Sequence, residues 1–317
     1  MQIKYGKLFF IFILLVYIIN LHWVSVRQYP VPIAAAALEP TVAYAEPTPT
    51  PSAETQPTSF VSVALIGRLG NQLFQAASSY GISRLRGSRW CIRDLENSIL
   101  SSAVVFRVEP ERCPSDVHFE GMGEGVRFHH FHAQFKTDMP GENVHVGDYL
   151  QSYKYFSHTE LPFLLKDGYW ASAWVKERGI KVGVHVRRGD YAVNDLIGAV
   201  PGPSFYAKAF GLIPSFNPAE VVVCSDDPAW VRSQPIFGGG MLITEGHTAG
   251  QDLAILAACR YVVVSIGTFG WWGGFLAHHD RQSTVIYDSE PYKAGRVDAD
   301  DVKEDFFPPS WIGVSPN

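Results

Sequence analysis

The stretch IKVGVHVRRGDY, residues 180–191, decides the fold, because it joins a buried strand to a charged exit. Valine recurs at every second position, which predicts a strand over residues 180–188. Four polar side chains gather at its end: His185, Arg187, Arg188 and Asp190. Side chains alternate along a strand, so His185 and Arg187 are expected on one face and Arg188 on the other. Two adjacent guanidinium groups at such an exit need a negative partner, either a ligand or a structural carboxylate.

Apolar strands alternate with helical patterns through the rest of the second half. Helical spacing begins in 204–213, and AEVVVCSDDPAWVRSQ (219–234) gives a strand, an acidic exit and a helix. AGQDLAILAACRYVVVSIGTFGWWGGFLA (249–277) gives helix, strand, turn and helix, and STVIYDS (283–289) is a last strand. Alternation of this kind predicts an α/β fold with a parallel, doubly wound sheet.

The first half opens in the same way, with FVSVALIGRLGNQLFQAASSYGISRLRG, residues 60–87. Residues 60–66 are expected to form a strand, followed by a glycine turn and a helix capped by Asn71. The glycine spacing fits neither the dinucleotide fingerprint nor the P-loop, so the turn itself does not indicate a nucleotide. Helices are expected around 153–178, and the boundary between the two halves near 170–180.

Polar residues concentrate where the strands of the second half end. Besides the exit after 180–188, these are Ser225 and Asp226, and then Ser265, Thr268 and Phe269. Ligands of open parallel sheets bind outside the carboxyl ends of the strands. Arginine forks and helix N-termini match phosphate oxygens, and an acidic exit suits a ribose or a base edge. The pattern predicts a nucleoside diphosphate pocket.

Structural explanations of the same residues stay open at this stage. The arginine pair could form salt bridges with Asp190, Asp226 or Asp252, and His185 could be a satisfied core histidine. The segment SIGTFGWWGG, residues 265–274, could be only a tightly packed turn eased by glycines.

The N-terminus has the pattern of a membrane anchor. Lysines occur in residues 1–7, ahead of the apolar segment 8–26, which is long enough to span a bilayer. Basic residues before the span predict a cytosolic tail at 1–7 and a luminal remainder, although a cleaved signal peptide is the alternative. Residues 27–59 are rich in Pro, Thr, Ala and Ser, which predicts a disordered stalk.

Composition excludes some functions. With 47% hydrophobic residues and a formal net charge of −5, the chain can bury a core but offers no general basic field for nucleic acid. The four cysteines, Cys91, Cys113, Cys224 and Cys259, lack metal-site spacing. Pairing of Cys91 with Cys113 and of Cys224 with Cys259, or free buried thiols, are open alternatives.

No metal site is expected. DADD (298–301) contains an Asp-x-Asp pattern but fits a solvated turn near the C-terminus better than a metal site. FHHFH (128–132) has histidine spacing that suits an aromatic loop better than tetrahedral ligation.

Four segments together resemble the galactoside α-1,2-fucosyltransferase family: GRLGNQLFQ (67–75), VGVHVRRGDY (182–191), SIGTFGWWGG (265–274) and FFPPSWIGV (306–314). The resemblance covers about residues 60–317. It implies a GT-B-like fold of two Rossmann-like domains that face each other, an acceptor-side domain at 60–178 and a GDP-fucose-binding domain at 179–317. It also implies a Golgi membrane protein of type II orientation, with no metal and no cofactor besides the donor GDP-fucose.

The implied reaction is the inverting transfer of L-fucose from GDP-fucose to the 2-hydroxyl of a terminal galactose on a glycan. Fixed donors must stabilise the departing diphosphate in the absence of a metal. The expected catalytic residues are Arg187, Arg188 and Asp190, with Asp190 either taking the acceptor proton or orienting Arg188. The expected donor-binding residues are His185, Arg187, Arg188, Ser225, Asp226, Ser265, Thr268 and Phe269. The alternatives are a fucosyltransferase with another acceptor, including protein, and a non-catalytic anchored glycan-binding protein.

Overall fold

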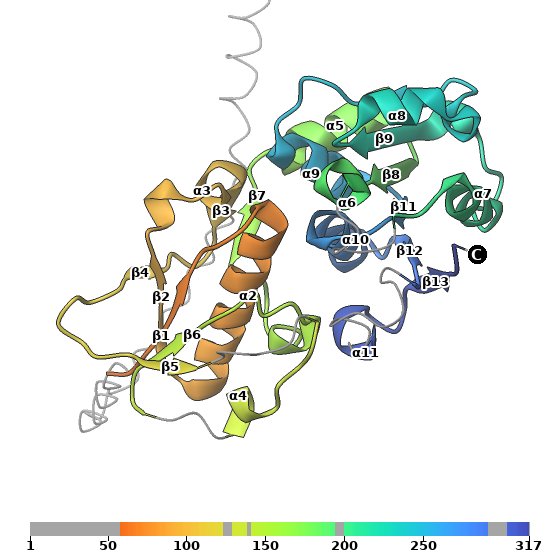
Figure 1. The fold of residues 1–317 in the computed structure, drawn as a ribbon. Helices are drawn as coiled ribbons and strands as arrows, with labels where there is room; N and C mark the ends of the chain where they lie inside the picture. The colour runs from red at the N-terminus through yellow and green to blue at the C-terminus, as the bar shows by residue number, and fades with distance from the viewer. Residues whose placement is uncertain (1–57, 123–128, 138–140, 194–199, 291–302, 317) are drawn as a thin grey trace, which may run out of the picture. The chain divides into compact units, whose positions relative to one another are not determined.

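The structure is a computed structural model of the chain that describes residues 58–122, 129–137, 141–193, 200–290 and 303–316 (Figure 1). The described residues all belong to one compact unit, Thr55–Asn317. The predicted tail, the anchor at 8–26 and nearly all of the stalk lie outside the described residues. In the described part of the chain, none of the helices has the length and apolar character that a bilayer span requires.

The second half forms a six-stranded sheet in the order β10-β9-β8-β11-β12-β13, and every pairing in it is parallel. The strands are β8 (Val182–Val186), β9 (Val221–Ser225), β10 (Leu242–Ile243), β11 (Tyr261–Val264), β12 (Thr284–Asp288) and β13 (Ile312–Val314). The predicted parallel sheet is therefore confirmed. Since the chain runs outward from β8 in one direction and from β11 in the other, the strand order reverses between these two strands.

The first half forms a five-stranded sheet in the order β4-β2-β1-β6-β5, again with only parallel pairings. Its strands are β1 (Phe60–Ala64), β2 (Arg89–Arg93), β4 (Glu111–Arg112), β5 (Glu120–Met122) and β6 (Val144–Val146). Here the strand order reverses between β1 and β6. Each sheet therefore has its own crevice, at the carboxyl ends of its central strands.

A separate two-stranded antiparallel sheet pairs β3 (Val104–Phe106) with β7 (Phe163–Leu165). Its second strand, β7, lies within the region where helices were expected around 153–178; the helices there are α5 (Gly168–Glu177) and a short 3-10 helix, η2 (Tyr153–Tyr155). The expected helices are therefore present in part, and the strand between them was not predicted, because Phe163 has its partner in Phe106, 57 positions earlier by number. Local periodicity cannot show such a pairing.

The helices of both halves pack on the sheets (Figure 1). The longer ones are α2 (Leu69–Arg86), α5, α7 (Pro203–Gly211), α9 (Ala249–Ala258) and α10 (Thr268–Arg281). The shorter ones are α3 (Leu100–Ala103), α4 (Gln134–Thr137), α6 (Gly189–Val193), α8 (Pro228–Ser233) and α11 (Lys303–Phe306), with 3-10 turns η1 (Leu95–Asn97), η3 (Pro218–Glu220) and η4 (Pro235–Phe237).

An aromatic cluster joins α2, α10 and the C-terminal segment. Trp271 and Trp272 of α10 are completely buried, and the Phe74 ring of α2 lies 4.4 Å from the Trp271 ring. Phe306 stacks on Trp271, and its carbonyl accepts a hydrogen bond from Trp271 Nε1 at 2.8 Å. Because truncating such a buried side chain costs about 3–5 kcal/mol, this cluster is a major part of what fixes α2 against α10.

The cysteines divide into one disulfide and two thiols. Cys91 and Cys113 are bonded, which confirms one of the two pairings considered and ties β2 to the segment after β4. Cys224 and Cys259 are both free and buried, so the second pairing was wrong. Burial raises the pKa of both thiols, which keeps them in the unreactive protonated form.

Candidate functional site

A pocket of about 720 Å³ lies where the carboxyl ends of both sheets meet. The first half contributes residues that follow β1, β5 and β6: Gly67, Arg68, Gly70, Asn71, His129, Tyr149 and Gln151. The second half contributes His185, Arg187, Asp190, Tyr191, Ser225, Asp226, Ala249, Asp252, Ile266, Gly267, Thr268 and Phe269. The pocket thus takes residues from both switch points, which is where ligands of such sheets bind.

Arg187 follows β8 directly and its side chain is only 12% exposed. Nη1 donates to Asp226 and Nη2 donates to Asp190, so two carboxylates hold the plane of the guanidinium group. Its backbone N–H donates to Ser265 Oγ at 2.9 Å. Burial lowers the pKa of Arg187, and Asp190 opposes this effect. The result is a fixed cation whose remaining N–H groups can bind an anion.

Arg188 lies elsewhere, as side-chain alternation predicts. It is not among the residues that line the pocket; its guanidinium group lies 3.9 Å from the centre of the Trp230 ring. Its Nε is 3.5 Å from Asp227, and its backbone N–H donates to Asp226. The strand ends at Val186, and the chain turns Arg188 toward α8. Of the two arginines expected at the donor, only Arg187 lines the pocket, and a donor contact of Arg188 stays a prediction.

His185 forms a buried part of the pocket wall, with 4% exposure. Burial, helped by the nearby Arg187 charge, lowers its pKa to about 3, so the imidazole is neutral at physiological pH. Its Nδ1 is 3.3 Å from Ser265 Oγ. A Cβ on Gly270 would overlap His185 Nδ1 and lie 2.7 Å from His185 Cγ, so glycine is required for α10 to begin this close to β8.

Three helices begin at this pocket: α2, α9 and α10. The first N–H groups of each helix have no partner inside the helix, and the helix dipoles place partial positive charge there. Gly70 allows α2 and α10 to meet, since a Cβ there would lie 2.6 Å from Phe269 N. Together with Arg68 and Arg187, these termini make the pocket suitable for a polyanion.

The sequence suggested that Asn71 caps α2, but the structure shows a different role for this residue. The helix begins two residues earlier with no side-chain cap, and Asn71 Oδ1 instead accepts from Thr268 Oγ1 at 2.8 Å and from Gln151 Nε2 at 3.0 Å. The cap prediction was wrong because this amide bridges the exits of both sheets. Asn71 is thus the point at which the two halves of the pocket wall are joined.

The pocket's carboxylates differ in their partners. Asp190 and Asp226 both pair with Arg187, and Asp190 is also 3.6 Å from Arg68. Asp190 is thereby an orienting group for arginines, but for Arg187 rather than for Arg188. Asp252 instead lies 3.2 Å from His247 Nδ1. Burial raises the pKa of Asp252, while hydrogen bonds from Thr244 and His247 lower it.

Seven of the nine predicted site residues line the pocket: His185, Arg187, Asp190, Ser225, Asp226, Thr268 and Phe269. Ser265 lies beneath them, 2% exposed, where its hydroxyl supports Arg187 and His185. The first-half wall was missed as a site. Its signal was present in the segment 67–75, whose polar residues Arg68 and Asn71 stand at a strand-to-helix turn.

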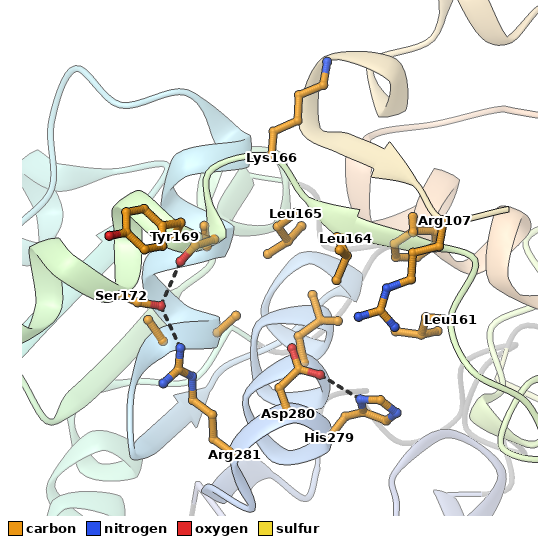
Figure 2. Close-up of a pocket in the computed structure, with 16 residues that line it drawn as sticks. Arg107, Leu161, Leu164, Leu165, Lys166, Tyr169, Ser172, His279, Asp280 and Arg281 are labelled. Atoms are coloured by element: carbon orange, nitrogen blue, oxygen red, sulfur yellow. Dashed lines mark hydrogen bonds and ion pairs between the residues drawn. The ribbon is translucent and has the colours of Figure 1, made fainter. Parts of the chain in front are cut away.

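A second cavity, of about 420 Å³, lies between α5, β7, α9 and α10 (Figure 2). Arg107 and Arg281 approach it from opposite sides, and Arg281 Nη2 donates to Ser172 at 2.6 Å. The cavity contacts α9 and α10 near their C-terminal ends, where the helix dipole is negative. None of the residues predicted to bind the donor lines this cavity.

Metal ligands do not cluster in the part of the chain that the structure describes: no group of three His, Cys, Asp or Glu side chains there could hold an ion. The DADD segment lies outside the described residues, so the expectation of no metal stays a prediction.

These features define an α/β protein with two parallel sheets and a pocket between them that is suited to an anion. The chain belongs to glycosyl transferase family 11, whose model matches residues 30–315. It is 31% identical over 280 residues to a galactoside 2-alpha-L-fucosyltransferase of Caenorhabditis elegans, covering 78% of each chain. It is 28% identical over 310 residues to galactoside alpha-(1,2)-fucosyltransferase 2 of Bos taurus, covering 88% of this chain and 85% of that one.

Among solved structures, the fucosyltransferase NodZ from Bradyrhizobium is similar, with a TM-score of 0.48, 16% identity, and coverage of 68% of this chain and 92% of that one. A NodZ alpha-1,6-fucosyltransferase soaked with GDP-fucose matches with a TM-score of 0.47 and 15% identity, over 68% of this chain and 92% of that one.

Proposed function

We propose that this glycosyltransferase moves L-fucose from GDP-fucose to the 2-hydroxyl of a terminal galactose, forming an α-1,2 linkage with inversion. The observation that carries the proposal is Arg187, a fixed guanidinium group in a pocket at two switch points, beside the start of α10. The names of the relatives support the acceptor and the linkage. The two parallel sheets support the finer expectation of two facing Rossmann-like domains.

The chemistry needs stabilisation of the leaving group more than it needs a strong base. As the bond between fucose C1 and the phosphate oxygen breaks, its electron pair leaves with GDP and the diphosphate gains negative charge. Galactose O2 forms the new bond to C1 and releases its proton to solvent or to a diphosphate oxygen. Arg187 and the first N–H groups of α10 are positioned to stabilise this charge without rearranging. The neutral His185 forms the wall beside them and adds no competing charge.

Guanine recognition is assigned to Asp252. Guanine presents adjacent N–H donors, which match the two oxygens of a carboxylate. Asp190 and Asp226 bind Arg187, whereas Asp252 lines the pocket from α9 without an arginine partner among the described residues. Asp252→Asn should therefore weaken GDP binding more than it weakens binding of a simple diphosphate.

Calorimetric titration with GDP, UDP and inorganic pyrophosphate tests the donor site, and transfer from GDP-fucose to β-galactosides tests the reaction. A 2-deoxygalactoside is the matched acceptor control, since it lacks only the proposed nucleophile. Transfer to the galactoside but not to its 2-deoxy analogue is expected. Equal transfer to both would refute the 2-hydroxyl as the site, and glycan binding without any turnover would favour a non-catalytic protein.

We propose further that the protein is a type II membrane protein of the Golgi with a luminal catalytic domain. The lysines before the apolar segment 8–26 and the Pro/Thr-rich stretch 27–59 support this orientation. The Cys91–Cys113 disulfide supports an oxidising compartment. The test is protease treatment of intact microsomes, in which the region after residue 60 should be protected until detergent is added; digestion without detergent would contradict it.

A further inference from the structure

His129 is a pocket residue with an unusual backbone. It lines the pocket although only 6% of it is exposed, and its φ of 56° lies in the left-handed region. A residue other than glycine adopts this backbone conformation at an energetic cost, which contacts with the surrounding structure must offset. The turn that follows the carboxyl end of β5 therefore holds this imidazole in place against a local preference.

The contacts that impose the conformation come from distant parts of the chain. Asp305 Oδ2 accepts from Phe131 N at 2.8 Å and lies 3.4 Å from His130 Nδ1. Tyr155 OH binds the same turn twice, accepting from His132 N at 3.0 Å and donating to the His130 carbonyl at 3.1 Å. The backbone just after His129 is thus held from two directions.

Asp305 is itself held firmly. Its side chain is 8% exposed, its Oδ1 lies 2.5 Å from Lys154 Nζ, and its carbonyl accepts from Ser152 Oγ. The next residue, Phe306, places its ring 3.9 Å from the His129 ring and is bonded through its carbonyl to Trp271 of α10. The C-terminal segment therefore connects the helix that starts at the donor wall to the His129 turn.

The geometry of the proposed reaction explains why His129 would lie at this wall of the pocket, so the inference rests on the proposed function. In an inverting displacement the incoming hydroxyl approaches C1 from the side opposite the leaving group. If Arg187 and α10 hold the diphosphate, the acceptor must enter along the first-half wall. That wall carries polar and aromatic groups, Asn71, Tyr149, Gln151 and His129, beside Arg68, which suits the hydroxyl groups of a sugar.

We infer that His129 contacts the acceptor glycan through its imidazole, and that Asp305 is the positioning residue that fixes the His129 turn. The contact is a hydrogen bond between the imidazole and an acceptor hydroxyl. Its loss should impair use of the acceptor and should not change binding of the nucleotide, which lies at the opposite wall.

The decisive variant is His129→Asn, because asparagine tolerates left-handed φ and so removes the ring without adding backbone strain. Four quantities are measured on the full-length chain: kcat/KM for a β-galactoside, Kd for GDP, hydrolysis of GDP-fucose without acceptor, and the melting temperature. We expect kcat/KM to fall about tenfold or more, as for loss of one substrate hydrogen bond in a desolvated site. The Kd for GDP and the rate of GDP-fucose hydrolysis should each change by less than about twofold. The melting temperature should fall, because the ring contact with Phe306 is lost, but the variant should stay folded at the assay temperature.

Asp305→Asn tests the positioning role. It should reproduce the selective loss of acceptor use, with donor hydrolysis retained, a pattern that a general loss of folding would not give. His279→Asn is the matched control, since His279 lies in the second cavity of Figure 2 and should change nothing.

Unchanged acceptor kcat/KM for His129→Asn would overturn the inference, as would an equal loss of GDP affinity. A wild-type chain that binds GDP but never fucosylates galactosides would refute the proposed function, and the inference with it. The two failures are distinguished by the wild-type reaction alone.

Discussion

Arg187→Lys is the perturbation that tests the donor site most sharply, since it keeps the charge and removes the planar fork. Of the five guanidinium N–H groups, two bond Asp226 and Asp190, and the rest remain for a ligand. An ammonium group has only three donors, so keeping both carboxylates leaves at most one for the diphosphate.

The expected loss of activity follows from the number of N–H donors that remain for the diphosphate. Losing one charge-assisted hydrogen bond costs about 1.5–3 kcal/mol. This corresponds to roughly a 10- to 100-fold loss in kcat/KM for GDP-fucose, and to more if two bonds are lost. Stability should change by less than about 1 kcal/mol, because Asp190 and Asp226 are 45% and 33% exposed.

Arg188→Lys should behave differently. Its guanidinium group lies over Trp230, so the lysine variant should lose roughly 1 kcal/mol of stability and keep near-normal turnover. Arg281→Lys, in the second cavity, is the matched control and should alter neither quantity. The assay pairs initial-rate kinetics with calorimetric GDP binding and thermal unfolding for each variant. Near-normal turnover and GDP affinity for Arg187→Lys would refute the assignment of the donor site.

Three further predictions concern pH, redox state and metal. Burial raises the pKa of Asp288 to about 6, so the wild-type protein loses stability as the pH rises from about 4 to 6. The free energy of unfolding of Asp288→Asn should exceed that of the wild type by up to roughly 3 kcal/mol at pH 7.5 and by little at pH 4. Denaturant unfolding at the two pH values measures this difference. An advantage equal at both pH values would contradict this. Reducing the Cys91–Cys113 disulfide, which spans 22 positions, should lower stability by about 3 kcal/mol; Cys91→Ser should show the same loss and no further response to reductant. Excess EDTA should leave transfer unchanged, and a loss that manganese restores would revive the DADD segment as a metal site.

The second sheet was predictable because its longer strands, β8, β9, β11 and β12, are rich in valine or isoleucine and lie between helical patterns. Burial on both faces of a parallel sheet selects such apolar strands. The first sheet was harder to predict from the sequence. β4 and β5 have two and three residues, and they exist only through pairing with β2 and β6. No local pattern distinguishes strands of that length from loops.

The site divides in the same way. His185, Arg187 and Asp226 could be predicted, because strand exits in one parallel sheet must lie at one edge. Asn71 and His129 could not be assigned, because their roles depend on how the two sheets and the C-terminal segment meet. Asparagine before a helical pattern indicates a cap by default, and only the contact with Thr268 shows the other use of its amide.

The central claim is that this pocket transfers fucose from GDP-fucose to the 2-hydroxyl of galactose. The most direct test incubates the purified full-length chain with GDP-fucose and lactose and determines the product linkage by NMR. One product is expected, with fucose α-linked to O2 of the galactose and GDP released in equal amount. Fucose on any other position, a β linkage, or GDP release with no fucosylated product would contradict it.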